Sequence, residues 1–157
     1  MTDIIEIIPT PSQLVFAKEE AKKIGVLNNS ILEGKGNAHG ILGEIIVADY
    51  INADRANTYD YDLVRNGRTI DVKTKQCTSK PDPSYYCSVA NYNTSQDCEV
   101  YGFVRILKDF SKCWILGGIK REDFKMEQGL DTIGEHFISV TYSSEHFKKD
   151  FAFYVKV

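Results

Sequence analysis

The sequence of 157 residues has few cysteines and histidines, and their spacing excludes several kinds of site. No CxxC pair occurs, no zinc-binding pattern is complete, and no Ser-His-Asp or Cys-His arrangement can be assembled. The residues concerned are Cys77, Cys87, Cys98, Cys113, His39, His136 and His146. We therefore interpret the cysteines as structural thiols of a protein in a reducing compartment.

The sequence also lacks long apolar runs and an excess of basic charge. No run approaches the roughly 20 apolar residues of a membrane span, and the N-terminus, MTDIIEIIPTP, lacks the regions of a signal peptide. We therefore expect a cytoplasmic protein with no membrane partner. A formal net charge of −3 argues against coating of nucleic acid by bulk electrostatics, although it leaves room for a local basic groove.

What is present is a composition typical of one globular domain. With 43% apolar residues, a chain of 157 residues is long enough to bury a core without disulfide bonds. We therefore predict a single α/β domain over residues 1–157, with a mixed central β-sheet flanked by helices. Residues 1–37 would form an N-terminal helical region and loop, 38–118 the catalytic core, and 119–157 the C-terminal strands.

Two segments carry helix signals. Thr10-Pro11-Ser12-Gln13 predicts a helix start with a capping box, and the helix is expected to run to about Ile24, before Gly25. A second helix is predicted over 38–51, where an apolar stripe recurs at helical spacing, namely Ile41, Ile45, Ala48 and Ile51.

Strand signals follow. The run 98–107 reads as a central strand and 113–117 as the neighbouring strand, with 137–142 and 151–157 as further strands. The run 4–8 fits either a strand or a packed arm.

A β-hairpin is predicted between Asp60 and Lys75, in the sequence DYDLVRNGRTIDVKTK. Asn66-Gly67 between two β-prone runs favours a two-residue type I′ turn, and this turn sets the register of the two strands. The register places Leu63, Ile70, Tyr61 and Val72 on an apolar face, and the opposite face carries Asp60, Asp62, Asp71 and Lys73.

Opposed carboxylates give the polar face two possible roles. Asp62 directly opposite Asp71 would be destabilising alone, but two close carboxylates are what a hard divalent cation binds. The alternative is a solvated face with a cross-strand ion pair between Asp60 and Lys73.

Glu44 is the second unusual carboxylate, because it falls inside the apolar stripe of the helix predicted over 38–51. A buried charge is disfavoured without a partner, so Glu44 is a functional candidate. Gly40 and Gly43 beside it remove bulk and would allow close packing. The alternative is a glutamate at the edge of the stripe that reaches water.

Two lysines outside the hairpin are candidates for contacts with nucleic acid. Lys35 lies between two glycines, an arrangement that permits close approach to a phosphate, but GKG lacks the spacing of a P-loop and a flexible loop is the competing interpretation. Lys80 lies in a long polar connection whose tyrosines could stack on bases or pack in the loop, namely Tyr85, Tyr86 and Tyr92.

The order and spacing of the acidic residues resemble the PD-(D/E)XK nuclease superfamily, whose fold is restriction-endonuclease-like. The resemblance covers roughly residues 38 to 107, and the matching residues are Glu44 in GILGE, Asp62 in DYDLV, and Asp71 with Lys73 in IDVKTK. The family's usual proline before the first aspartate is Tyr61 here, a departure that leaves Asp60 as a competing candidate.

The resemblance implies a role for each residue. Asp62 and Asp71 would bind a divalent metal ion, normally Mg²⁺ with Mn²⁺ as an alternative, and Glu44 would complete or tune the site. Lys73 would orient or help deprotonate the attacking water and stabilise charge on the phosphate. Gln96 matches a glutamine that some branches place beside the active site, and Lys75 would meet the scissile or an adjacent phosphate.

The implied function is metal-dependent hydrolysis of DNA phosphodiester bonds. This reaction needs a hydroxide nucleophile at neutral pH and relief of negative charge in the transition state, both of which a bound metal ion supplies. One alternative is a structure-selective nuclease of the junction-resolvase type, which would act as a homodimer. The other is a non-catalytic nucleic-acid-binding or scaffold domain of the same fold.

Overall fold

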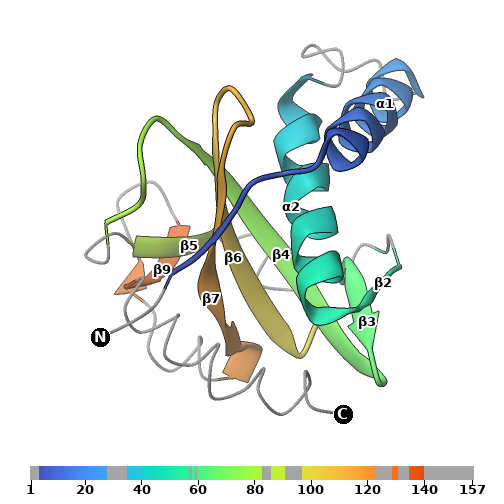
Figure 1. Cartoon of the computed structure of the whole chain (residues 1–157). Helices are drawn as coiled ribbons and strands as arrows, with labels where there is room; N and C mark the ends of the chain where they lie inside the picture. Colours follow the sequence, from blue (N-terminus) through green and yellow to red (C-terminus); the bar gives the residue numbers. More distant parts are fainter. Residues whose placement is uncertain are drawn as a thin grey trace.

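The chain adopts an α/β fold in a computed structural model that describes residues 4–27, 35–56, 58, 60–82, 86–90, 97–122, 129–130 and 135–139 (Figure 1). A six-stranded sheet has the order β1-β7-β6-β4-β3-β2, in which β4 and β6 run parallel and the other neighbours antiparallel. The predicted mixed sheet is therefore confirmed. Its strands are β1 (Ile5–Ile7), β2 (Asp54–Arg55), β3 (Leu63–Arg65), β4 (Arg68–Cys77), β6 (Val100–Leu107) and β7 (Cys113–Lys120).

A second, three-stranded sheet has the order β5-β9-β8. Strand β5 (Tyr86–Ala90) lies in the segment that the sequence suggested was a long polar connection. Strands β8 (Gly129–Leu130) and β9 (Glu135–Ser139) complete this sheet, and β9 overlaps the run predicted over 137–142. The run 151–157 lies outside the described residues.

Helix α1 (Pro11–Leu27) begins at the predicted residue. The capping box is present, because the Thr10 N–H donates to Gln13 Oε1 at 2.9 Å and the Gln13 N–H donates to Thr10 Oγ1 at 3.2 Å. The predicted end before Gly25 is wrong, since the helix continues to Leu27. Glycine costs a helix interior only about 1 kcal/mol relative to alanine, so it does not have to end a helix.

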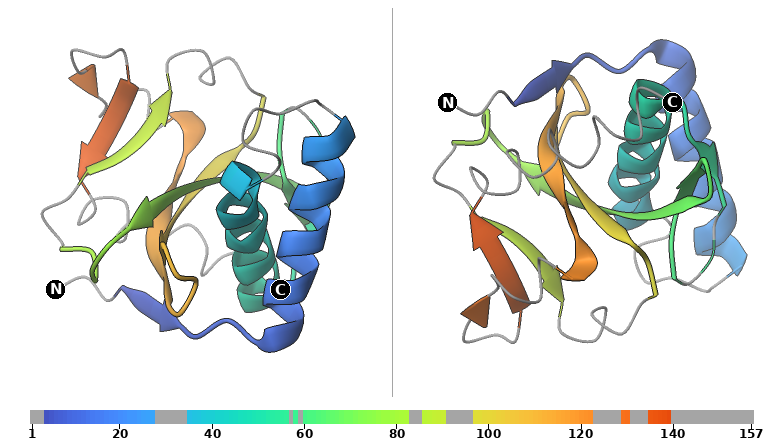
Figure 2. Two further views of the ribbon diagram at one scale, coloured as in Figure 1. Left: turned by 90° about the horizontal axis from the view of Figure 1, so that it is seen from above. Right: turned by 90° about the horizontal axis from the view of Figure 1, so that it is seen from below.

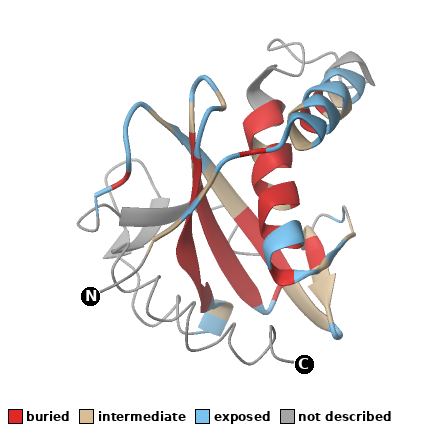
Figure 3. Ribbon diagram, in the orientation of Figure 1, coloured by how far each residue is buried: buried red, intermediate tan, exposed pale blue. Residues whose placement is uncertain are grey.

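Helix α2 (Lys35–Ile51) lies between α1 and the sheet (Figures 1 and 2). The predicted stripe is buried, but burial extends further around the helix to Leu42, Ile46 and Val47. Figure 3 shows the contrast between the buried α2 and the largely exposed α1 that covers it. In the described part of the chain, no helix has both the length and the apolar character needed to cross a bilayer.

Two apolar clusters lie on opposite faces of the six-stranded sheet. The cluster beneath the helices contains Leu63, Ile70 and Val72 from the hairpin strands. The cluster on the other face consists of Cys98, Tyr101, Phe103, Trp114, Leu116 and Ile119. Alternating side chains of β6 belong to different clusters, so both faces of this central strand are covered.

Candidate active site

The β3–β4 hairpin has the predicted turn and register. Asn66 and Gly67 both have positive φ, at 49° and 77°, as a type I′ turn requires. The paired residues are Arg65 with Arg68, Val64 with Thr69 and Leu63 with Ile70. The sequence therefore predicted this part of the site correctly, because the turn chemistry is local.

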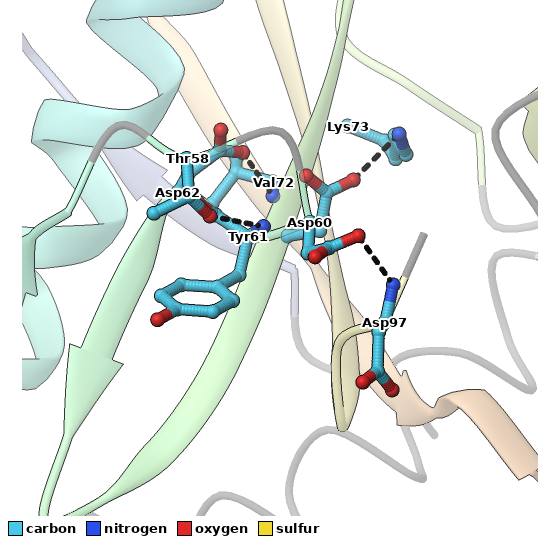
Figure 4. A network of polar contacts seen from close by, with 8 residues as sticks. Thr58, Asp60, Tyr61, Asp62, Val72, Lys73 and Asp97 are labelled. Carbon is cyan, nitrogen blue, oxygen red and sulfur yellow. Dashed lines mark hydrogen bonds and ion pairs between the residues drawn. The ribbon is translucent and has the colours of Figure 1, made fainter. Parts of the chain in front are cut away.

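The hairpin departs from the prediction at Asp62. The Asp62 N–H donates to the carbonyl of Ile70 at 2.9 Å, and Ile70 is already the partner of Leu63, so the ladder stops there. Asp62 consequently does not pair with Asp71 across the ladder. Its Oδ2 atom instead accepts a hydrogen bond of 2.8 Å from the Val72 N–H, as Figure 4 shows. This bond joins the Asp62 carboxylate to the strand that carries Asp71.

The same departure moves Tyr61. The sequence placed Tyr61 on the apolar face with Leu63, but it packs with the cluster on the other side of the sheet. Thr58 stabilises this turn, because its hydroxyl accepts from the Tyr61 N–H at 3.0 Å and donates to the Tyr61 carbonyl at 2.9 Å. Alternation along a strand ends where the ladder ends, which explains the error.

Asp71 and Lys73 lie on one face of β4, as predicted. Their partners on the parallel strand β6 are Tyr101 and Phe103, and the Asp71 side chain is only 4% exposed. Lys73 Nζ lies 2.5 Å from Asp71 Oδ2. The two side chains therefore form a largely buried ion pair on the strand.

Asp60 has a different environment from its neighbour Asp62. It was expected to lie opposite Lys73, but its Oδ1 atom accepts a hydrogen bond of 3.0 Å from the Asp97 N–H (Figure 4). Asp60 therefore joins the entrance of the hairpin to the segment before β6, which is a structural contact.

Glu44 comes from α2 and is 17% exposed. A buried carboxylate needs a partner, and the partner of Glu44 is Arg55 of β2. The Nη2 and Nε atoms of Arg55 lie 2.9 Å and 3.3 Å from Glu44 Oε2. Sequence reasoning missed Arg55. The available signal was a buried carboxylate followed, after the helix, by an arginine on the strand that leads to the hairpin.

Burial and mutual repulsion raise the pKa of all three carboxyl groups. Asp71 has a pKa of about 7, because of burial and then the charge of Asp62. Asp62 has a pKa of about 6, because of burial and then the charge of Glu44. Burial also raises the pKa of Glu44, while Arg55 acts in the opposite direction. The three groups therefore act as one electrostatic cluster, which we call the carboxylate cluster.

The carboxylate cluster fits a hard divalent cation in its donor chemistry, since such ions take oxygen ligands. A cation would also relieve the repulsion that raises these pKa values. Within the described residues, however, no three or more acidic, histidine or cysteine side chains converge as a preformed ligand set. Glu44 is engaged with Arg55, so Asp62 and Asp71 are the residues best placed to hold a metal ion.

The other predicted site residues contribute less. Gln96 and the side chain of Lys35 lie outside the described residues. Lys75 and Lys80 are exposed, and Lys75 pairs with Arg105 of β6 on the face that carries Lys73. This face therefore continues from the ion pair into a basic stretch.

A cavity of about 350 Å³ lies near the carboxylate cluster and was not foreseen from the sequence. Its wall includes Cys98, whose pKa rises to about 12 because of burial and then the negative charge of Asp71. The charged side chains around it are balanced in sign, namely Arg68, Lys120, Arg121, Asp97, Glu99 and Glu122. Arg68 and Glu99 pair with each other at 3.0 Å.

No protein-family model and no curated protein matches the chain.

Proposed function

We propose that the protein is a metal-dependent nuclease that hydrolyses DNA phosphodiester bonds, with Mg²⁺ as its ion, Mn²⁺ as a substitute, and a restriction-endonuclease-like fold. The observation that carries this proposal is the carboxylate cluster beside Lys73. Residues from α2, the entrance to β3 and strand β4 influence one another's ionisation there. They follow the order Glu, Asp, Asp-x-Lys that resembles the PD-(D/E)XK superfamily.

The arrangement suits phosphodiester hydrolysis. A bound divalent ion supplies a hydroxide nucleophile and Lewis acidity at neutral pH. Asp62 and Asp71 would hold this ion, and both are oriented by contacts within the hairpin, Asp62 by Val72 and Asp71 by Lys73. Lys73 brings a fixed positive charge to the position where a phosphate would gain negative charge.

The substrate class is supported by the surroundings. The stretch with Lys75 and Arg105 continues the face of Lys73. Such groups attract a phosphate backbone even though the whole chain carries a net charge of −3.

The test is incubation of the full chain with linear, circular, single-stranded and branched DNA, with Mg²⁺ or with EDTA. Cleavage that requires the metal supports the proposal, and preference for branched DNA by a dimer would identify the junction-resolvase type. Binding without cleavage in Mg²⁺ or Mn²⁺ would contradict it and favour the non-catalytic domain. Asp71→Asn is the matched control for a contaminating nuclease.

A further inference from the structure

The contact between Arg55 and Glu44 has a consequence for how many metal ions the site binds. Two nitrogen atoms of Arg55 contact the same carboxylate oxygen, Glu44 Oε2, and both side chains are less than one-fifth exposed. Charge-assisted contacts of an arginine fork are strong, and separating a buried pair leaves an uncompensated charge. Glu44 Oε2 is therefore not readily available to a metal ion.

Arg55 is held in this position from several sides. Its backbone pairs with Leu63 in the β2–β3 ladder, and the next residue, Ala56, donates its N–H to the Asp62 carbonyl at 2.8 Å. Its guanidinium also lies over the ring of Phe16 from α1, with Cζ 5.6 Å from the ring centroid. The pairing of β2 with β3 and with the residue before β3 thus positions both Asp62 and the Arg55 guanidinium that contacts Glu44.

The charges of the site favour one ion when Arg55 is present. With all groups ionised, three carboxylates and two cationic side chains, Arg55 and Lys73, leave one net negative charge. One divalent ion and one phosphodiester would bring this charge to zero. A second divalent ion would leave two excess positive charges in a poorly solvated site, which is unfavourable.

We propose that Arg55, by occupying Glu44, limits the carboxylate cluster to a single divalent cation held by Asp62 and Asp71. Without Arg55, Glu44 would be a ligand of a second ion. In the wild type, the positive charge of Arg55 takes the place of that ion. This makes Arg55 a positioning residue rather than a catalytic one. The inference rests on the proposed metal-dependent function, and it adds the number of ions and the role of Glu44.

The test counts bound Mn²⁺ by electron paramagnetic resonance of the free ion, with calorimetry for affinity. We expect one Mn²⁺ for the wild type and for Arg55→Lys, which keeps the charge. We expect two for Arg55→Gln, and one again for the double variant Arg55→Gln/Glu44→Gln. One ion in Arg55→Gln, or two in the wild type, would overturn the inference and leave the nuclease proposal intact. No bound ion in the wild type would overturn both.

The double variant also covers the case in which Arg55→Gln fails to fold. It removes one charge of each sign, so the net charge of the cluster is unchanged. We expect its affinity for the single ion to stay within about threefold of the wild type. A tenfold or greater loss of affinity in a folded double variant would show that Glu44 binds the first ion, and the inference would fail.

Discussion

Gly43 of α2 lies so close to Thr74 of β4 that a Cβ atom at residue 43 would be 2.0 Å from Thr74 Oγ1. This is the residue before Glu44, so the close approach of helix and sheet at Gly43 influences the depth at which the Glu44 carboxylate enters the site. The sequence suggested that both Gly40 and Gly43 permit close packing. Only Gly43 does so, since a Cβ atom at Gly40 would meet nothing within 4 Å.

This difference gives a paired prediction for stability. We expect Gly43→Ala to lower the free energy of unfolding by about 1–3 kcal/mol, because an overpacked contact displaces the helix. We expect Gly40→Ala to raise it by about 0.5–1 kcal/mol, because alanine favours a helix interior. Urea denaturation of both variants measures these changes. Equal effects of the same sign would contradict the close contact.

A second prediction separates the two neighbouring aspartates. Asp62→Asn should lower the rate of Mg²⁺-dependent DNA cleavage by about a hundredfold or more, because it removes a charged metal ligand. Asp60→Asn should stay within a fewfold of the wild type, because an amide oxygen can still accept from the Asp97 N–H. Single-turnover rates provide the comparison. An inactive Asp60→Asn variant with an active Asp62→Asn variant would show that Asp60, and not Asp62, is the metal ligand.

Lys73 is expected to act in catalysis rather than only in folding. Lys73→Ala should reduce the cleavage rate by about 100-fold or more, since it removes the fixed charge beside the phosphate. Lys75→Ala, on the same strand face but exposed, should weaken DNA binding and reduce its dependence on salt while leaving the saturated rate nearly unchanged. A Lys73→Ala variant with full activity would argue against the mechanism.

The metal-free protein should lose stability as the pH rises through the carboxylate window. The pKa values of Asp62 and Asp71 rise from the ordinary value of 3.8 to about 6 and about 7 on folding. Between the unfolded and the folded pKa values, these two aspartates lose their protons at a lower pH in the unfolded chain than in the folded protein. An increase in pH therefore favours the unfolded state. Each pKa unit corresponds to about 1.4 kcal/mol.

Urea denaturation in EDTA from pH 4 to pH 7 tests this expectation. Asp71→Asn isolates the effect from other titrating groups, and it should lose less stability than the wild type across the same range. A steeper loss in the variant would contradict the raised pKa of Asp71.

Metal binding should reverse the instability near pH 7. We expect Mg²⁺ to raise the melting temperature of the wild type, because a ligand that binds only the folded state stabilises it. Asp71→Asn should melt at a higher temperature than the wild type in EDTA, since it removes a buried repulsion, and should respond little to Mg²⁺. Differential scanning calorimetry measures both. A lower melting temperature of the variant in EDTA would show that the ion pair with Lys73 outweighs the repulsion.

The sequence by itself determined the local parts of this protein. The Asn66-Gly67 turn set the register near the hairpin end, Thr10 and Gln13 set the start of α1, and alternation along β4 placed Asp71 and Lys73 on one face. Each of these follows from backbone conformation or from a hydrogen bond within a few residues, so its signal is contained in a short stretch of sequence.

Only the tertiary structure decided how the carboxylates meet. In the folded protein, Asp62 lies outside the β3–β4 ladder, Glu44 forms an ion pair with Arg55, and Gly43 lies close to Thr74. These contacts depend on how far two elements approach and how much water they exclude, quantities that residue spacing does not encode. For the same reason, the raised pKa values of the cluster appear only when helix and hairpin are packed together.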